Sequence, residues 1–127
     1  MADHIRKEAL NPKSLFNSTA MGFSQAVKVG DLVFCSGQVG RGETLEQQAR
    51  EALVNVRTLL GSAGCTMSDI VKMTIYSTDE QAWEKTADLR AEFLPPPFPA
   101  STFVVVRALA LPQLKIEIDV TAMVGAG

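Results

Sequence analysis

Residues 24–38 read SQAVKVGDLVFCSGQ, and this stretch contains two short runs of residues that favour β-strands. The runs cover 24–29 and 32–36, and only Gly30 and Asp31 separate them. A two-residue joint that contains glycine is typical of a β-hairpin, because glycine readily adopts the positive φ angle that such turns require. We therefore predict a hairpin whose second strand leads into the segment 36–38.

The segment after the hairpin predicts a long helix. Thr44 stands three residues before Gln47, which is the spacing of a capping box at a helix N-terminus. Gly61 and Gly64 are typical of a helix C-terminus. Between these signals, apolar residues recur at helical spacing and predict one buried face, made by Leu45, Ala49, Ala52, Leu53, Val56, Leu59 and Leu60.

The second half of the chain predicts three more strands, over 69–76, 101–107 and 115–124, and one more helix. This helix begins near Thr78 and cannot continue into the Pro95-Pro96-Pro97 run. The element order predicts one α+β domain over residues 1–127, with two helices on one side of a mixed sheet. The stripe of the second helix that faces the core is expected to be Trp83, Ala87, Ala91 and Leu94.

The last two strands differ in their apolar pattern. Apolar and polar residues alternate over 115–124, which predicts one buried face. Over 101–107 both faces carry apolar side chains, with Val104 on one face and Phe103 and Val105 on the other. The helices can cover only one of these faces, so we expect a neighbouring subunit to cover the other.

Composition excludes several classes of function. The formal net charge is −2 and no run of Lys or Arg reaches three residues, which argues against nucleic acid as a partner. No apolar stretch approaches the roughly 18 residues of a membrane span, and the first residues lack the apolar segment of a signal peptide. Only two cysteines are present, Cys35 and Cys65, without framework spacing. We expect a cytoplasmic protein in which both are small buried hydrophobes.

The scarcity of histidine excludes further chemistry. His4 is the only histidine of the chain and lies near its N-terminus. Neither a Ser-His nor a Cys-His pair can therefore be assembled elsewhere, and no histidine-based metal site is available. We expect no metal and no cofactor.

Three stretches resemble signatures of the Rid family, the reactive intermediate deaminases also called the YjgF or L-PSP family. They are 23–38, Phe98-Pro99-Ala100 and 115–119, and element order agrees over about 17–124. The resemblance implies a chorismate-mutase-like fold, in which two helices pack on one face of a mixed six-stranded sheet. It also implies a homotrimer with three clefts between subunits, and the hydrolysis of enamines or imines to ketones and ammonia.

Only some of the family's functional residues have counterparts at the matching positions of this sequence. Active members carry an arginine directly after the FPA motif that grips the substrate carboxylate, and here that residue is Ser101. The frequent cysteine two residues later is Phe103, the tyrosine before the Ser-Gln pair is Phe23, and an asparagine of the second helix aligns with Ala87. The residues that match are Glu117, Ser36 and Gly37.

The resemblance therefore implies a divergent branch that lacks the catalytic arginine. Glu117 is the candidate catalytic residue that positions water, and the alternative is an ordinary polar residue at a subunit interface. Ser36 and Gly37 would supply polar and backbone contacts. Phe23, Ser101 and Phe103 would shape a pocket that is drier than usual, although Ser101 can equally be a simple space-filler.

Arg107 is the candidate for a displaced carboxylate anchor, because it follows the same strand face as Ser101 and Phe103. The alternative is an arginine in solvent, or one paired with Glu117 or Asp119; Arg41 and Arg90 are weaker candidates for the anchor. Two functions remain open. One is an enzyme that hydrolyses a C=N or enamine intermediate larger or less acidic than 2-iminopropionate. The other is a trimeric, non-catalytic protein that binds a small molecule or has a regulatory role.

Overall fold

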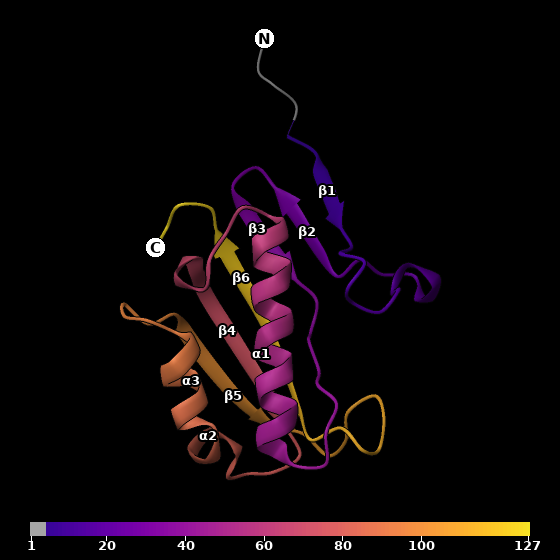
Figure 1. Ribbon diagram of the computed structural model, residues 1–127, viewed down its shortest axis with the longest axis vertical. Helices are drawn as coiled ribbons and strands as arrows, with labels where there is room; N and C mark the ends of the chain where they lie inside the picture. The colour runs from indigo at the N-terminus through magenta and orange to yellow at the C-terminus, as the bar shows by residue number, and fades with distance from the viewer. Residues whose placement is uncertain (1–4) are drawn as a thin grey trace.

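The computed structural model describes residues 5–127 and contains one six-stranded mixed sheet (Figure 1). The strands lie in the order β1-β2-β3-β6-β4-β5, and β4 and β5 are the parallel pair. They cover β1 Lys7–Leu10, β2 Ala26–Val29, β3 Leu32–Cys35, β4 Ile70–Ser77, β5 Ala100–Val105 and β6 Ile116–Met123. His4 lies outside the described residues. The α+β class and the mixed six-stranded sheet are as expected.

The N-terminal hairpin is confirmed. Val29 of β2 pairs with Leu32 of β3, so Gly30 and Asp31 alone form the turn, and Gly30 has a φ of 59°. The sixth strand, β1, was not recognised from local sequence signals. It is only four residues long and mostly exposed, so it lacks the alternating pattern that marks a half-buried strand.

The long helix is also confirmed. Helix α1 spans Leu45–Ser62, and its capping box is present: the Gln47 N–H donates to Thr44 Oγ1 at 3.1 Å, and the Thr44 N–H donates to Gln47 Oε1 at 3.2 Å. Gly61 lies within the helix rather than after it, and the left-handed residue beyond its end is Gly64. All seven residues of the predicted apolar face are buried.

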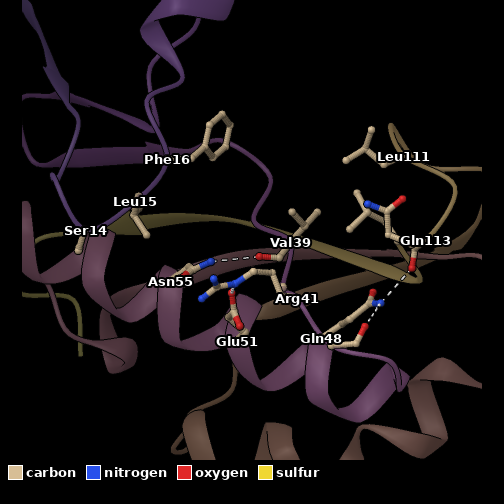
Figure 2. A pocket seen from close by; sticks show the side chains of 13 residues that line it. Ser14, Leu15, Phe16, Val39, Arg41, Gln48, Glu51, Asn55, Leu111 and Gln113 are labelled. Atoms are coloured by element: carbon tan, nitrogen blue, oxygen red, sulfur yellow. Dashed lines mark hydrogen bonds and ion pairs between the residues drawn. The ribbon is translucent and has the colours of Figure 1, made fainter.

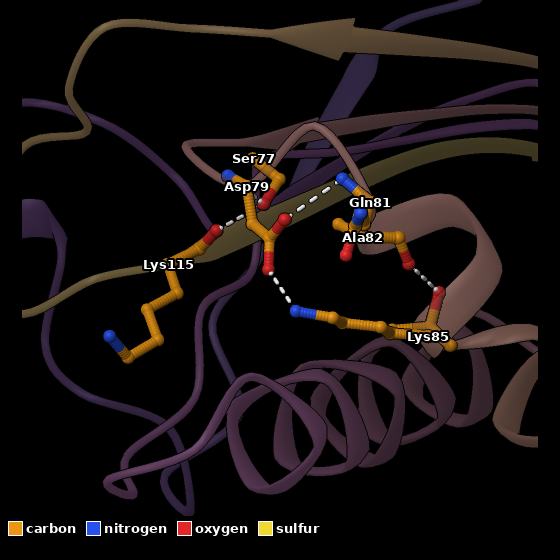
Figure 3. Close-up of polar contacts among 7 residues, drawn as sticks. Ser77, Asp79, Gln81, Ala82, Lys85 and Lys115 are labelled. Carbon is orange, nitrogen blue, oxygen red and sulfur yellow. Dashed lines mark hydrogen bonds and ion pairs between the residues drawn. The ribbon is translucent and has the colours of Figure 1, made fainter.

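The prediction for the second helix was wrong in its start and in its buried face. A polar turn follows β4, where the Asp79 carboxylate accepts hydrogen bonds from the Gln81 N–H and from Lys85 Nζ, both at 2.8 Å (Figure 3). Helical structure therefore begins only after this turn. It forms two short helices, α2 Ala82–Lys85 and α3 Ala87–Phe93. The buried residues are Ala82, Thr86, Leu89, Phe93 and Leu94.

The expected inner stripe is thus displaced by about one residue from the observed one. Ala87 and Ala91 are exposed, and Trp83 is 37% exposed instead of lying in the core. The Trp83 indole contacts the partly buried ring of Phe103 at 6.3 Å between centroids. Short helices beside an edge strand leave such side chains at the margin of the core, which periodicity alone does not reveal.

The two faces of the sheet differ sharply. Helix α1 crosses one face, and the alternate residues of β6 that point toward it are buried: Ile116, Ile118, Val120 and Ala122 (Figure 1). On the other face Glu117 and Asp119 are half-buried, whereas Phe34 and Met123 retain 47% and 41% of their exposure. Within residues 5–127, none of the helices has the length and apolar character that crossing a membrane requires.

Candidate active site

The segment Ser36-Gly37-Gln38 lies directly against β6. The Gln38 N–H donates to the carbonyl of Ile118 at 2.8 Å, and the Ile118 N–H donates back to the carbonyl of Gln38 at 2.9 Å. This bridge brings Gly37 under the side chain of Glu117. A Cβ atom at Gly37 would lie 2.6 Å from Cδ of Glu117, so only glycine allows the carboxylate to rest there. Two expected site residues, Gly37 and Glu117, are therefore in contact.

The environment of Glu117 favours its protonated form. Burial is the larger cause that raises the pKa of this carboxyl, and the neighbouring carboxylate of Asp119 adds to it. Within residues 5–127 the Glu117 side chain makes no hydrogen bond or salt bridge. A carboxyl group whose pKa moves toward neutrality, and whose oxygens face a partly open surface, can exchange protons with a bound water or substrate.

Tyr76 stands across from Glu117 on the neighbouring strand β4. Burial raises the pKa of its phenol, and the carboxylates of Asp119 and Glu117 raise it further. The phenol therefore stays protonated at neutral pH. It gives the Glu117 surface a neutral hydroxyl rather than a second negative charge.

Two buried glutamines hold the segment in place. Gln38 Nε2 donates to Gln25 Oε1 at 2.9 Å, and Gln25 Nε2 donates to the carbonyl of Phe16 at 3.1 Å. Ser36 Oγ donates to the carbonyl of Ser24 at 2.6 Å, so its only hydroxyl proton is already used. Sequence reasoning missed the structural role of Gln25 and Gln38, although both belong to the motifs that carried the resemblance.

Phe23 lies in the segment that leads into β2, next to Ser24. It retains 39% of its exposure, and its ring meets that of Phe16 edge-on at 6.1 Å between centroids. The pair forms an exposed apolar rim beside Ser24, whose carbonyl binds Ser36. Phe23, Ser36, Gly37 and Glu117 thus belong to neighbouring segments of the structure.

Ser101 and Phe103 lie elsewhere. On β5 they pair with Met73 and Ile75 of β4, whose side chains are buried on the helix-covered face. Glu117 pairs instead with Tyr76, and both point to the opposite face. Within one chain, the structure does not bring Ser101 together with Glu117.

Ser101 lines a groove of about 350 Å3 between the short helices and the start of β5. Ala87, which aligns with the family asparagine, lines the same groove. The walls are otherwise mainly apolar, and one wall residue is charged, Arg90. The full lining is Met73, Trp83, Ala87, Arg90, Ala91, Leu94, Phe98, Pro99 and Ser101.

Arg107 lies just past the end of β5, with an exposed side chain. It does not line this groove, and within residues 5–127 it forms no salt bridge with Glu117 or Asp119. Its role as an anchor stays a prediction. The structure adds that Arg90, a weaker candidate from the sequence, shares a cavity with Ser101.

A larger cavity of about 500 Å3 lies between α1 and the loops around residues 14–16, 39–42 and 111–114 (Figure 2). Its one cation, Arg41, is neutralised by Glu51 at 3.0 Å. Asn55 Nδ2 donates to the carbonyl of Val39 at 3.0 Å and ties the loop to the helix (Figure 2). The cavity is thus a gap between loops that are tied to α1, and its one cation already has a carboxylate partner.

Thiol and metal chemistry have little support. Cys35 and Cys65 are both buried, as expected. Burial raises the pKa of Cys35 to about 12 and also raises that of Cys65, so both thiols stay protonated. Within residues 5–127 no three Asp, Glu, Cys or His side chains gather in a cluster that could hold a metal ion.

Comparison with known proteins gives a consistent result. The family described as "Endoribonuclease L-PSP" matches residues 15–124. The chain is 32% identical to Reactive Intermediate Deaminase A, chloroplastic, of Arabidopsis thaliana, over 95% of this chain and 68% of that protein. It is 31% identical to a 2-iminobutanoate/2-iminopropanoate deaminase of Dermatophagoides farinae, over 76% of this chain and 81% of that protein. The crystal structure of a YjgF/YER057c/UK114 family member from Mycobacterium tuberculosis, 34% identical, superposes with a TM-score of 0.84 over 93% of this chain and 99% of that one.

Proposed function

This chain belongs to the endoribonuclease L-PSP family, with relatives named as YjgF, RutC and reactive intermediate deaminase proteins, and on that basis we propose that it hydrolyses an enamine or imine to a carbonyl compound and ammonia. The observation that carries the proposal is the Glu117 carboxyl, half-buried over Gly37 with a raised pKa. The names of the Arabidopsis and Dermatophagoides relatives support the same reaction class.

In the proposed mechanism Glu117 acts on water. Its carboxylate accepts a proton as the water oxygen adds to the carbon of the C=N bond, and the imine nitrogen gains a proton. The resulting carbinolamine then expels ammonia and becomes a carbonyl compound, so one water is consumed for each ammonia released. An enamine would first be protonated at carbon to give the imine. No metal or cofactor takes part in these steps.

The complete site is proposed to lie between two copies of the chain in a homotrimer. Glu117 and the Ser101 groove occupy opposite faces of one sheet, so a single subunit cannot present both to one small substrate. Two exposed apolar regions are available for contact between copies. One includes Phe34 and Met123 on the open face, and the other includes Val104 and Val105 on the edge strand β5.

The substrate is proposed to be larger or less acidic than 2-iminopropionate. Ser101 offers one neutral hydroxyl where active relatives place the bidentate fork of an arginine. Phe23 and Phe103 add apolar surface in place of polar or small side chains. We further propose that the protein acts in the cytoplasm.

The serine at position 101, in place of the family's arginine, favours a second candidate function. A trimeric protein that binds a small molecule without turning it over would keep the cleft and tolerate the loss of the arginine at position 101. Such a protein would show a ligand-dependent rise in melting temperature and no product.

Ammonia release separates the two candidates. An amino acid oxidase would generate 2-iminopropionate or a bulkier, aromatic imino acid in place, and the wild type would be compared with Glu117→Gln and Ser101→Arg. We expect the wild type to accelerate hydrolysis of the bulkier imine, and Glu117→Gln to lower the rate on the order of 100-fold or more, as loss of a general base does. Ser101→Arg should shift preference toward the smaller substrate, because the longer side chain adds a carboxylate-binding fork and fills part of the groove.

Glu80→Gln makes the same chemical change at an exposed position and serves as the matched control. It should behave as the wild type. Equal rates in the wild type and Glu117→Gln would remove Glu117 from the mechanism. A wild type that accelerates neither imine would favour the binding protein.

A further inference from the structure

The groove between the short helices and β5 contains a cation that the proposed mechanism does not use. We propose that Arg90 anchors the carboxylate of the substrate in this groove, in place of the arginine missing after the FPA motif. The inference rests on the proposed function for the reaction, but it concerns binding alone. It assigns the groove to a carboxylate that carries an aromatic or branched apolar group.

The guanidinium of Arg90 is held in a fixed orientation. It lies over the ring of Trp83, with Cζ 3.6 Å from the ring centroid. One nitrogen, Nη1, donates to the carbonyl of Trp83 at 2.6 Å and to Thr86 Oγ1 at 2.7 Å. Both protons of Nη1 are therefore used by Trp83 of α2 and by Thr86, which lies between α2 and α3, and these contacts set the position of the whole group.

The opposite edge of the guanidinium is available. Within residues 5–127, Nε and Nη2 of Arg90 make no hydrogen bond and no salt bridge. These two nitrogens present parallel N–H groups, which match the two oxygens of a carboxylate. An arginine that binds the preceding helix and the Thr86 junction through one nitrogen, and keeps the edge formed by its other two nitrogens free, is arranged to bind an external carboxylate.

The electrostatics of the site favour the same ligand. Arg90 is partly buried, and burial lowers the pKa of its guanidinium; among the described residues 5–127 no carboxylate opposes that effect. Arg41 and Arg50, by contrast, are paired with Glu51 and Glu92. A desolvated cation without a counter-charge raises the free energy of the empty site, and a bound anion would relieve it.

The size and walls of the groove restrict the rest of the ligand. Its volume of about 350 Å3 lies at the small end of the range for ligand pockets, roughly 300–1,000 Å3. Ala87 and Ala91 give it a shallow apolar floor, and Phe98, 72% exposed, stands at its edge. The Ser101 hydroxyl lies in the same groove and offers a weak polar contact, since its donation to the carbonyl of Pro99 is long, at 3.3 Å. One anionic group and one apolar group therefore fit together.

The test uses equilibrium binding, so that it does not depend on turnover. Phenylpyruvate, the 2-oxo acid that hydrolysis of an aromatic 2-imino acid would give, would be titrated into the full-length protein and its binding measured by calorimetry. Its neutral amide would serve as the uncharged control. Arg90→Met keeps an unbranched apolar chain over Trp83 and removes the fork. Arg50→Met is the matched control, because it removes a surface arginine that is paired with Glu92.

We expect the wild type and Arg50→Met to bind phenylpyruvate equally, and Arg90→Met to bind it on the order of 10- to 150-fold more weakly, as expected when a charge-assisted hydrogen bond is lost. The amide should bind the wild type and Arg90→Met alike. Arg90→Lys keeps the charge without the fork and should recover only part of the affinity.

Two outcomes would overturn the inference. In one, phenylpyruvate binds Arg90→Met as tightly as the wild type, or fails to bind the wild type at all. In the other, Arg107→Met loses the affinity instead, which would place the anchor beyond the end of β5. If Arg90-dependent binding is found but no imine is hydrolysed, the proposed reaction fails while the carboxylate site stands.

Discussion

At the scale of single residues, the contact between Gly37 and Glu117 links the sequence motif to the proposed chemistry. Glycine at position 37 matters for space rather than for backbone angle, because any Cβ there would force the Glu117 carboxyl group to move. The glutamate in turn lies half-buried beside Asp119, which raises the pKa of its carboxyl. The SGQ motif therefore contributes the room above Gly37 as well as the Ser36 and Gln38 side chains that hold the segment in place.

The raised pKa of Glu117 has a consequence for stability that is independent of any substrate. A carboxyl with a higher pKa in the folded than in the unfolded state binds its proton more tightly when folded. Its contribution to stability is therefore present at low pH and is lost as pH rises from the ordinary value of 4.5 through the folded pKa. Glu117→Gln should be neutral at pH 4 and should raise the melting temperature relative to the wild type at pH 7.

Thermal melts of both proteins at half-unit steps from pH 4 to pH 7 would measure this difference. Glu80→Gln, at an exposed position, should show no such trend. A melting temperature for Glu117→Gln that falls below the wild type as pH rises would mean that the fold stabilises the ionised carboxylate, which is incompatible with a raised pKa at Glu117.

At the scale of elements, the candidate site depends on how the segment 36–38 is fastened to β6 and to the Gln25 side chain. Gln38→Met would leave Gln25 Oε1 buried without its donor, at 2.9 Å in the wild type. An unsatisfied buried polar group costs about 1–3 kcal/mol, so we expect a loss of stability of that order. Because Gly37 would also be less firmly placed under Glu117, imine hydrolysis should fall more than stability alone explains.

Urea unfolding, together with ammonia release under conditions where the variant is fully folded, would separate these two effects. Gln81→Met changes the same residue type at an exposed position and should leave both quantities unchanged. If Gln38→Met were as stable as the wild type, the glutamine pair would not be what holds the segment.

Local signals in the sequence correctly predicted those elements whose structure is determined by residues close together in the chain. The hairpin at Gly30-Asp31 and the cap at Thr44 are of this kind, and both are observed. The second helix was misplaced because the turn at Asp79 and the exposure of Trp83 depend on contacts with side chains several residues away and on the edge position of β5. Periodicity carries no information on such contacts.

The candidate site was predictable only as a set of residues, not as an arrangement. Motif matches singled out Gly37 and Glu117, and the structure brings them into contact. That Ser101 faces away from Glu117 follows from the register of β4 against both β5 and β6, which no single segment encodes. Arg90 became prominent only when the groove it shares with Ser101 was known.

At the scale of the whole molecule, the two surfaces to which we assign the reaction lie on opposite faces of one sheet. The Glu117 surface lies on the open face, and the Arg90 groove lies on the face that carries the helices. In the homotrimer that we propose, each open face would meet the edge strand of the next copy and bring the two surfaces together. The exposed Val104 and Val105 on β5 are suited to such a contact.

We propose that imine hydrolysis takes place where Glu117 of one subunit faces the Arg90 groove of the next. The most direct measurement is complementation: Glu117→Gln and Arg90→Met chains are co-expressed in equal amounts, and imine hydrolysis is measured at low substrate concentration. Each variant alone should be nearly inactive. Random mixed trimers should recover about one quarter of the wild-type activity. At each shared site the chance of an intact Glu117 is about one half, and so is the chance of an intact Arg90, so about one site in four has both. Mixed trimers no more active than the two separate variants would contradict a site shared between subunits.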